Sequence, residues 1–426
     1  MPDLWNAPHR SEPVSARVPI PGSKSLTNRW LILSAIAGGP SRINLPLQAR
    51  DTILMVQALS SLGVAIEAAG DAYVVTPGPL AGPTEVDCGL AGTVMRFVPP
   101  IAALANGDVR FDGDPHARVR PMQQIIDSLR TLNVVVDDDN RGSLPFIVRA
   151  KGFVPGGTVT LDASASSQFV SALLLAGCRY DSGITIKHEG GPLPSMPHID
   201  MSVAVLREVG IKVDVDVQDA QHATWQVHPG IPQPFNVTVE PDLSNAAPFL
   251  AAALVCGGSV TIPNWPEQTN QAGDALRTIL PLLGAEVTKT GSDLTVSGSG
   301  KINGIDLDLH DVGELTPVIA VLCALADSPS QLRGIAHLRG HETDRLAALV
   351  SELSKLGGDI SETADGLIIK PAPLHGGRFA TYSDHRMAMA AAVLGLAVPD
   401  LLVEDISTTG KTLPEFSELW LDLVSA

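Results

Sequence analysis

The sequence contains few cations, and this shortage restricts what the protein binds. Only 29 of its 426 residues are Lys or Arg, against 46 Asp or Glu, so the formal net charge is −17. Such a chain is repelled by nucleic acid and by anionic membrane surfaces unless its cations gather in one place. We therefore expect neither nucleic acid nor membrane as a partner, and the positions of the few cations become informative.

Cysteine motifs and aromatic residues are also scarce. Aromatic residues make up 4% of the chain, whereas 45% of the residues are hydrophobic, which suits tightly packed helices and short strands. The four cysteines, Cys88, Cys178, Cys256 and Cys323, show neither C-x-x-C nor another metal-ligand spacing. We therefore expect reduced, buried thiols and no metal site.

Long apolar runs are missing as well. No uncharged apolar run reaches the roughly 18–20 residues that a membrane span requires. The N-terminal stretch MPDLWNAPHRSEP has an early Asp, two prolines and no apolar segment, so it resembles neither a signal peptide nor a transit peptide. The sequence therefore predicts a cytoplasmic protein.

Six apolar stretches share one design. Each opens with small or polar residues that suit a helix N-cap and continues as an Ala- and Leu-rich helix that is apolar on every face. The stretches are residues 23–39, 89–107, 164–183, 242–258, 311–326 and 382–400. Helices of this kind belong in the interior of a domain.

A second motif alternates with the first. Amphipathic helices are expected to end at Gly63, Asn133, Gly210, Gly284 and Gly357, and a β-hairpin pattern follows each of them. The spacing of roughly 70–77 residues indicates an internal repeat. Five repeat units are complete, and we expect the N-terminal segment EPVSARVPI to supply the missing strand of the sixth.

The repeats predict an α/β fold with two similar lobes. The Pro-rich stretch 228–242 divides the repeats three and three, and residues 18–22 are expected to form the other crossing. One lobe is expected to comprise residues 1–18 and 236–426, and the other residues 19–235. We expect the site to lie in a cleft between them.

The stretch PGSKSLTNRW, residues 21–30, looks like half of a phosphate loop. It is not a Walker A loop, because Val18 occupies the position of the first glycine of that motif. Helix N-termini nevertheless favour anions, because free N–H groups and about half a positive charge lie there. Several such ends facing one cleft predict a site for phosphates and carboxylates.

Seven cations lie at helix starts or in loops between the repeats. They are Lys24, Arg29, Arg96, Arg120, Arg345, Arg386 and Lys411. Taken singly, Arg345 beside Asp344 and Arg386 near Asp384 fit ordinary surface ion pairs. The recurrence of all seven at such positions favours an anion-binding site.

Seven separated motifs, in order along the chain, carry a family resemblance: PGSKSLTNR, GLAGTVMR, DGDPHARVRPM, DASASSQF, LRGHETDRL, YSDHRMAM and GKTLPEF. Together they resemble the 5-enolpyruvylshikimate-3-phosphate synthase family, and more closely its actinobacterial-type members. The resemblance implies a two-lobe inverse α/β barrel, the enolpyruvyl transferase fold built from six βαβαββ units. It also implies transfer of the enolpyruvyl group of phosphoenolpyruvate to the 5-hydroxyl of shikimate 3-phosphate, with release of phosphate. The family belongs to the shikimate pathway and needs no metal or organic cofactor, and we expect a monomer.

The resemblance also assigns contacts to both substrates. The residues that it places at shikimate 3-phosphate are Lys24, Ser25, Arg29, Ser166, Ser167, Gln168, Ser195, Glu314 and His341. Those that it places at phosphoenolpyruvate are Lys24, Gly92, Arg120, Gln168, Arg345, Arg386 and Lys411. Glycine allows close backbone approach, and arginine grips oxygens through two parallel hydrogen bonds.

Three residues are candidates for proton transfer. Glu314 stands where the family has its acidic proton acceptor, and nearby cations are expected to keep it ionised. Lys24 and Glu342 are the candidates for proton transfer at C3 of the enol ether of the tetrahedral addition–elimination pathway. His341 and Glu342 do not begin an H-E-x-x-H motif, which argues against a metal pair.

The chain departs from the commoner family pattern at five positions. Glu314 replaces Asp, and His341 replaces Lys, so that the charge at His341 depends on pH. His337 replaces Asn, His198 replaces Tyr, and Leu90 replaces Asn. These differences affect fine contacts more than the reaction.

Two alternatives remain open on the sequence. The sister family, which acts on UDP-N-acetylglucosamine, carries a reactive Cys in the loop that corresponds to GDPHARVRPM, and that loop has none here. A catalytically silent relative that only binds anions is the other alternative. Gly92 followed by Thr93 resembles forms that glyphosate inhibits, so we expect this chain to be a glyphosate target.

Overall fold

The computed structural model describes residues 3–426, which form two compact units. Unit 1 comprises Met1–Pro21 and Glu240–Ala426, and unit 2 comprises Gly22–Val239. Residues 1–2 of the expected first lobe lie outside the described residues. Both crossings between the units fall a few residues later than the sequence analysis placed them.

Local pairing explains the later crossings. The Val18 N–H donates to the carbonyl of Thr261 at 2.9 Å, and Ile20 is buried in the core of unit 1, so this segment remains with unit 1. Strand β14 (Asn236–Thr238) pairs in parallel with β3 (Ser41–Asn44), so β14 lies in unit 2.

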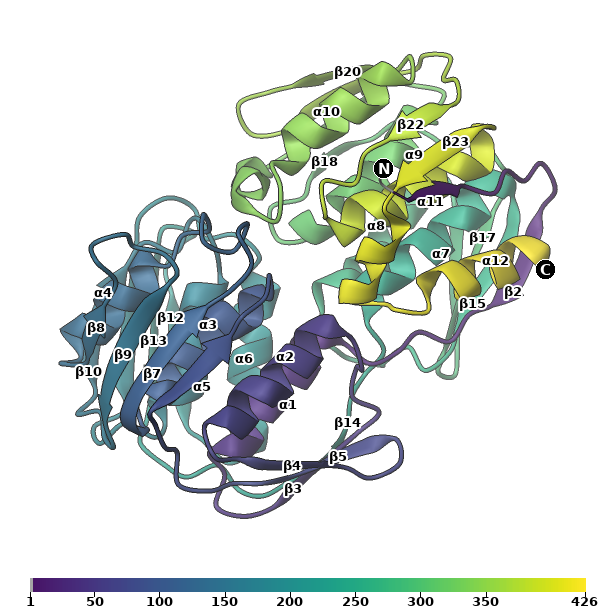
Figure 1. Ribbon diagram of the computed structural model, residues 1–426. Helices are drawn as coiled ribbons and strands as arrows, with labels where there is room; N and C mark the ends of the chain where they lie inside the picture. Colours follow the sequence, from purple (N-terminus) through teal and green to yellow (C-terminus); the bar gives the residue numbers. More distant parts are fainter. Residues whose placement is uncertain (1–2) are drawn as a thin grey trace. The chain divides into compact units, whose positions relative to one another are not determined.

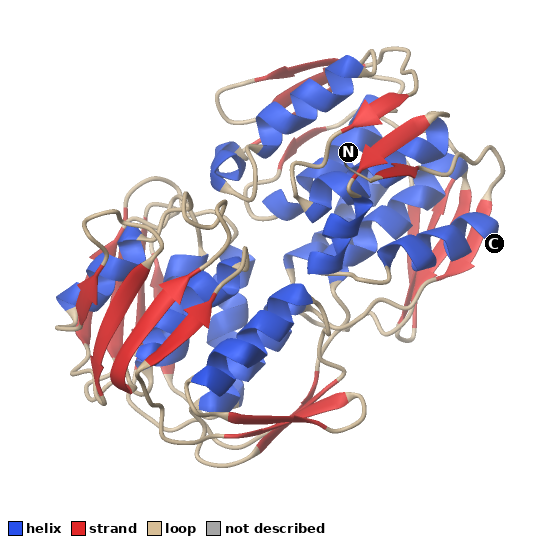
Figure 2. Cartoon of the chain, viewed as in Figure 1, coloured by secondary structure: helices blue, strands red, loops and turns tan. Residues whose placement is uncertain are grey.

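Among residues 3–426 there are six β-sheets; five of them have four strands on one plan, and the sixth has three strands (Figure 1, Figure 2). A first strand pairs in parallel with a second strand, and a buried helix leads into the second strand. The second strand pairs antiparallel with a fourth, and the third lies at the edge beside the fourth. One repeat of unit 2 shows the plan in full: β6 (Thr84–Asp87), α3 (Gly92–Ala102), β7 (Asn106–Asp112), α4 (Gln123–Thr131), β8 (Val135–Asp137) and β9 (Phe146–Lys151). This is the βαβαββ unit that the sequence predicted.

The other two repeats of unit 2 have the same order. One consists of β10 (Gly157–Leu161), α5 (Gln168–Gly177), β11 (Ile184–Glu189), α6 (Met196–Glu208), β12 (Val213–Val217) and β13 (His222–Val227). In the other, β14 is the first strand, followed in space by α1 (Lys24–Ala35), β3, α2 (Arg50–Ser61), β4 (Ala65–Ala68) and β5 (Ala72–Thr76).

Unit 1 contains the remaining three repeats. The first has β2 (Val14–Arg17), α7 (Leu243–Cys256), β15 (Gly258–Ile262), the 3-10 helix η1 (Ala272–Ala275), α8 (Leu276–Leu282), β16 (Glu286–Thr290) and β17 (Asp293–Gly298). The second has β18 (Asp306–Asp308), η2 (Gly313–Leu315), α9 (Thr316–Ala324), β19 (Ser330–Arg333), η3 (Ala336–Gly340), α10 (Arg345–Lys355), β20 (Asp359–Glu362) and β21 (Leu367–Lys370). The third has β22 (Gly377–Phe379), α11 (His385–Ala397), β23 (Leu401–Glu404), η4 (Ile406–Lys411), α12 (Phe416–Ser425) and β1 (Leu4–Asn6).

The N-terminal segment corrects one expectation. Strand β1 pairs antiparallel with β23 and completes the third sheet of unit 1, so the assignment of EPVSARVPI to that place is wrong. Strand β2, which lies in EPVSARVPI, instead pairs in parallel with β15. The physical reason is position in the chain: β2 directly precedes the crossing into unit 2, as β14 precedes the crossing back. Each unit thus takes one first strand from the segment that directly precedes a crossing.

The buried helices form the core of each unit. Helices α1, α3 and α5 contact one another in unit 2, and α7, α9 and α11 do so in unit 1 (Figure 1). All residues of α3 and nearly all of α11 are buried, as expected for helices that are apolar on every face. None of the described helices is long and apolar enough to cross a membrane.

The amphipathic helices end where the second motif predicted. The backbone has positive φ at each of the five closing residues, Gly63, Asn133, Gly210, Gly284 and Gly357. Glycine, and to a lesser degree asparagine, adopts this conformation at low cost, and it turns the chain out of the helix into the hairpin. This local chemistry is why the repeat is visible in the sequence.

Candidate active site

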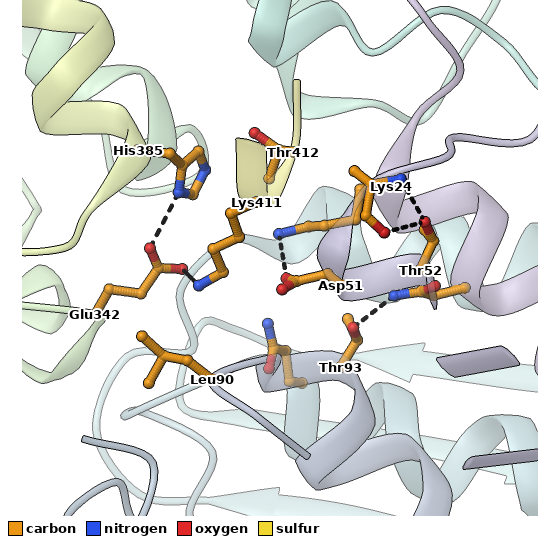
Figure 3. Close-up of polar contacts among 12 residues, drawn as sticks. Lys24, Asp51, Thr52, Leu90, Thr93, Glu342, His385, Lys411 and Thr412 are labelled. Carbon is orange, nitrogen blue, oxygen red and sulfur yellow. Dashed lines mark hydrogen bonds and ion pairs between the residues drawn. The ribbon is translucent and has the colours of Figure 1, made fainter. Parts of the chain in front are cut away.

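The start of α1 presents Lys24 in unit 2. Ser23 caps the helix by accepting a hydrogen bond from the Leu26 N–H at 3.4 Å, so PGSKS leads directly into the helix. The Nζ atom of Lys24 lies 3.4 Å from Oδ2 of Asp51, in the first turn of α2 (Figure 3). The side chain of Asp51 is 2% exposed and that of Lys24 is 20% exposed, so a buried carboxylate holds a partly accessible ammonium group.

Arg29 is buried on α1, and its donors bond within unit 2. Its Nε donates to Ser202 Oγ at 2.8 Å, and its Nη1 donates to the carbonyl of Ser25 at 2.9 Å. Its Nη2 donates to the carbonyl of His198 at 2.7 Å, and its guanidinium lies 5.3 Å from the centre of the Phe97 ring. Arg29 therefore joins α1 to α6. A substrate contact by Arg29 stays a prediction.

Several groups converge at Gly92, the first residue of α3. A Cβ atom there would lie 2.9 Å from Arg96 Nη1, 3.0 Å from Gln168 Oε1 and 3.1 Å from Arg120 Nη2. Arg96 Nη1 donates to Gln168 Oε1 at 3.1 Å, and Arg120 Nη1 donates to the carbonyl of Leu90 at 3.2 Å. The glycine therefore leaves a small space bounded by two guanidinium groups and an amide.

The charges around this space are positive. Burial lowers the pKa of Arg96 well below its usual value, and the charge of Arg120 lowers it further. Among residues 3–426, no carboxylate oxygen lies within 4 Å of Arg96, and its Nε is buried without a hydrogen-bond partner. An anion beside these groups would relieve the repulsion, so their charge favours a phosphate or a carboxylate.

The predicted serines lie at the starts of α5 and α6. Ser167 is the N-cap of α5, and Ser166 Oγ accepts a hydrogen bond from the Gln168 N–H at 3.3 Å. Ser195 is the N-cap of α6 and has a left-handed backbone with φ of 56°. Ser167 is buried, whereas Ser166, Gln168 and Ser195 are half-buried.

Glu342 joins a lysine and a histidine in unit 1 (Figure 3). Its Oε1 lies 2.6 Å from Lys411 Nζ, and its Oε2 lies 3.1 Å from His385 Nδ1. Burial works to raise the pKa of Glu342, but Lys411 and His385 outweigh burial and hold that pKa well below its usual range. Glu342 is therefore ionised at neutral pH.

Arg345 pairs with Asp384 rather than with its chain neighbour Asp344. Arg345 Nε and Nη2 donate to the two oxygens of Asp384 at 2.8 and 3.2 Å. Burial works to lower the pKa of Arg345, but Asp384, with smaller contributions from Glu342 and Glu314, raises it above its usual value. Asp344 instead caps α10 by accepting a hydrogen bond from the Ala347 N–H at 3.0 Å. Asp384 also caps α11 through the N–H of Arg386 at 2.9 Å.

Glu314 and Arg386 lie on two further elements of unit 1. Ser244 Oγ donates to Glu314 Oε1, and the charge of Glu314 helps to raise the pKa of Arg345. Arg386 is 8% exposed in the first turn of α11. Among residues 3–426, no side chain or carbonyl accepts a hydrogen bond from its guanidinium group.

Three histidines form a row beside η2. The rings of His310 and His337 are 5.9 Å apart between centres, and those of His337 and His341 are 5.7 Å apart. His341 Nδ1 lies 3.4 Å from Arg345 Nη1. Burial lowers the pKa of His337 to about 4, with smaller contributions from His310 and Arg345. His337 is therefore neutral at neutral pH.

One group of side chains has the composition of a metal site. Ligand atoms of Glu342, Asp384 and His385 lie within 4.8 Å of one another. Both carboxylates, however, already face cations, Lys411 and Arg345. A divalent cation placed here would be repelled by these two charges, so the donor set does not fit a resident metal.

The sequence analysis assigned no role to Asp384 and Asp51, two carboxylates that pair with the cations, nor to His385. Asp384 and His385 carried a signal, because they stand beside Arg386 in the SDHRMAM motif. Asp51 carried none, because it begins a different helix from Lys24 and only the packing of α2 against α1 brings the two together.

The chain is similar to known proteins along its whole length. The family model described as EPSP synthase (3-phosphoshikimate 1-carboxyvinyltransferase) matches residues 8–420. A protein of Kocuria rhizophila named 3-phosphoshikimate 1-carboxyvinyltransferase is 56% identical over 436 aligned residues, which cover 100% of this chain and 97% of that protein.

Solved structures share the fold. An EPSP synthase from Acinetobacter baumannii matches with a TM-score of 0.78 at 23% identity, covering 99% of this chain and 98% of that one. The enolpyruvyl transferase NikO from Streptomyces tendae matches with a TM-score of 0.77 at 18% identity, covering 97% and 96%. At these identities the likeness shows the fold alone, and it confirms the predicted enolpyruvyl transferase fold.

Proposed function

Because the chain belongs to the EPSP synthase family, we propose that it transfers the enolpyruvyl group of phosphoenolpyruvate to the 5-hydroxyl of shikimate 3-phosphate and releases phosphate. The observation that carries this function is the full-length match, at 56% identity, to a relative named for the same activity. The cations at the helix starts of each unit also support this function. In a chain with a net charge of −17, they gather positive charge where the anionic substrates are proposed to bind. We place the reaction in the shikimate pathway, in aromatic amino acid biosynthesis, and in the cytoplasm.

Shikimate 3-phosphate is proposed to bind at helix starts of unit 2. Lys24 and Ser25 open α1, and Ser166 and Ser167 lie at the start of α5, where free N–H groups favour the phosphate. Ser195, before α6, is proposed to add a phosphate contact. The remaining proposed contacts are Arg29, Gln168, Glu314 and His341.

Phosphoenolpyruvate is proposed to use the positive space at Gly92. Arg120 and Gln168 border that space, and Lys24 is proposed to reach the same substrate. In unit 1, the proposed contacts are Arg345, Arg386 and Lys411. Arg386 supports this assignment most directly, because its guanidinium group is nearly buried without an acceptor.

The proton transfers follow from the charges. Glu314 is proposed to accept the proton of the 5-hydroxyl as the hydroxyl oxygen bonds to C2 of phosphoenolpyruvate. C3 gains a proton in the same addition, and the ammonium group of Lys24 is proposed to donate it. In the elimination, the bond between C2 and the phosphate oxygen breaks as C3 loses a proton. Glu342, which Lys411 and His385 hold ionised, is proposed to accept that proton from C3.

The two units are proposed to act on one substrate pair. The proposed contacts to each substrate come from residues of both units. The sequence analysis divided the chain into residues 1–18 plus 236–426 and residues 19–235, and it also expected the site to use both parts. All of them belong to a single chain, so we propose a monomer that needs no cofactor. Sedimentation with both substrates present tests the monomer.

The deciding experiment measures phosphate release from phosphoenolpyruvate with and without shikimate 3-phosphate. Release is expected only with both substrates. Glu314→Gln is expected to lower the rate by about 10²-fold or more, because it removes the proton acceptor. Glu286→Gln, an exposed change on β16, is the matched control and is expected to keep the wild-type rate.

Two other outcomes would replace the proposal. Release only with UDP-N-acetylglucosamine as the acceptor would move the chain to the sister activity. Tight binding of shikimate 3-phosphate without release from either acceptor would leave a silent anion-binding relative.

A further inference from the structure

Glu352 is a buried carboxylate on α10 that none of the proposed substrate contacts includes. It is 0% exposed. Its Oε2 accepts a hydrogen bond from the Ala380 N–H at 3.0 Å, and its Oε1 accepts one from the Tyr382 hydroxyl. Lys355 Nζ donates to Oε1 at 2.7 Å from the surface side, with 55% of the Lys355 side chain exposed. The carboxylate thus binds two groups of the short segment between β22 and α11.

That segment holds an unfavourable backbone conformation. Tyr382 and Ser383 have φ of 55° and 56°, so two successive non-glycine residues lie in the left-handed region. Such residues rarely adopt it, because Cβ crowds the backbone, and a bulky residue there is an outlier. The conformation persists only where surrounding contacts hold it. The two hydrogen bonds to Glu352 are contacts of this kind.

The strained turn leads directly into the active-site end of α11. Asp384 follows it as the N-cap, and Arg386 lies in the first turn of the helix. Arg345, at the start of α10, holds Asp384 through two hydrogen bonds. Glu352 lies about two helical turns further along α10, on the same side of the helix. Helix α10 therefore holds the turn on both sides of Tyr382 and Ser383.

We propose that Glu352 is a positioning residue for phosphoenolpyruvate. By holding Ala380 and Tyr382, it keeps the turn in its left-handed conformation and so sets the place of the Arg386 guanidinium group. Without this support the turn relaxes, and Arg386 moves with the start of α11. The proposal rests on the proposed function, in which Arg386 binds phosphoenolpyruvate.

Two variants test the support directly. Glu352→Gln carries no charge and keeps one acceptor oxygen, so the bonds from Ala380 and Tyr382 lose their charged acceptor, and the amide NH2 group can only donate to the Tyr382 oxygen. It is expected to raise the KM for phosphoenolpyruvate about tenfold, which corresponds to the loss of one buried hydrogen bond to a charged group. Tyr382→Phe removes only the hydroxyl and is expected to act in the same direction, with a smaller effect. The KM for shikimate 3-phosphate and kcat are expected to change little.

A matched control removes the third partner of the same carboxylate. Lys355→Met deletes the exposed donor and leaves the bonds to Ala380 and Tyr382 in place, so its KM for phosphoenolpyruvate is expected to equal that of the wild type. A rescue variant adds Ser383→Gly to Glu352→Gln. Because glycine adopts a φ near 56° without strain, the double variant is expected to recover most of the lost affinity.

The outcomes separate this inference from the proposed function. Calorimetry of phosphoenolpyruvate binding accompanies each assay, and thermal unfolding shows that each variant is folded. Wild-type protein that binds phosphoenolpyruvate but releases no phosphate overturns the proposed function, and the dissociation constants of the variants still test Glu352. Equal rises in both KM values, or no rescue by Ser383→Gly, would show that Glu352 only stabilises the fold. An unchanged affinity in Glu352→Gln would overturn the positioning role.

Discussion

Arg345 and Lys411 of unit 1 and Arg96 of unit 2 differ in how the fold neutralises their charges. In unit 1, Arg345 is paired with Asp384, and Lys411 lies 2.6 Å from Glu342. In unit 2, Arg96 has no carboxylate within 4 Å among the described residues, and it points with another arginine at the space beside Gly92. The ion pair of Lys24 in unit 2 is longer, at 3.4 Å.

This difference shows two routes to an anion site. A buried cation with a carboxylate partner is stabilised by the fold itself, so its geometry is set before a substrate binds. A buried cation without such a partner costs stability, and an anionic substrate supplies what the fold does not. We therefore expect changes in the paired cluster of Arg345 and Lys411 to affect folding first, and changes at Arg96 to affect binding first.

The largest effect is expected from Asp384→Asn. It leaves the buried guanidinium of Arg345 without its carboxylate, and removing one partner of a buried pair costs about 3–5 kcal/mol. Urea unfolding measures the loss. The control is Asp306→Asn, which breaks an exposed pair with Arg333 and is expected to leave the urea midpoint nearly unchanged, because solvent screens exposed charges. Equal losses in the two variants would mean that the network of unit 1 does not support the fold.

The pH dependence of stability is expected to come from His337. Its pKa is about 4 in the folded chain, against 6.5 for an ordinary histidine. Between these values the unfolded chain binds the additional proton, so stability falls as pH drops from about 6.5 to about 4, by up to about 3 kcal/mol. Burial also lowers the pKa of His385, which adds to the same trend.

Urea unfolding of the wild type and of His337→Asn, at pH values across this window, measures that trend. The variant is expected to lose the part of the slope that His337 contributes. His9→Asn, an exposed histidine before β2, serves as the control and is expected to keep the wild-type slope. Parallel curves for the wild type and His337→Asn would contradict the assignment.

Arg96→Met is expected to separate binding from folding in unit 2. Methionine fills similar space without the buried charge, so the free energy of unfolding is expected to stay the same or to rise. The affinity for phosphoenolpyruvate is expected to fall about 30-fold, or about 2 kcal/mol, the scale of one hydrogen bond to a charged group. Calorimetry and urea unfolding measure the two quantities. Destabilisation as large as that of Asp384→Asn would erase the contrast between the units.

The smallest effect is expected from Gly92→Ala. The added Cβ would meet only the ends of the side chains of Arg96, Gln168 and Arg120, which can shift, so stability is expected to change by less than about 0.5 kcal/mol. The anion space narrows, and the KM for phosphoenolpyruvate is expected to rise about tenfold. Gly340→Ala, whose Cβ would meet nothing within 4 Å, is the control for stability. Wild-type affinity in Gly92→Ala would mean that the substrate does not use this space.

Much of the fold could be predicted because its signals are local. The apolar helices follow from their composition, and the positive φ at Gly63 and Asn133 follows from the residue types that end the amphipathic helices. The place of EPVSARVPI could not be predicted, because strand pairing joins residues far apart in the chain, such as Val14 with Gly258. Periodicity identifies a strand but not its partner.

The candidate site likewise has features that the sequence predicts and features that depend on the tertiary structure. The sequence by itself determined the repeat, the helix starts and the residues of the family motifs, because each depends on neighbouring residues in the chain. Only the tertiary structure decided that Asp384 pairs with Arg345, that Asp51 holds Lys24, and that Glu352 supports the turn before α11. The free energy of a buried charge depends on which opposite charge or donor the packed helices bring within a few ångströms, and this choice is made across elements that the chain order keeps apart.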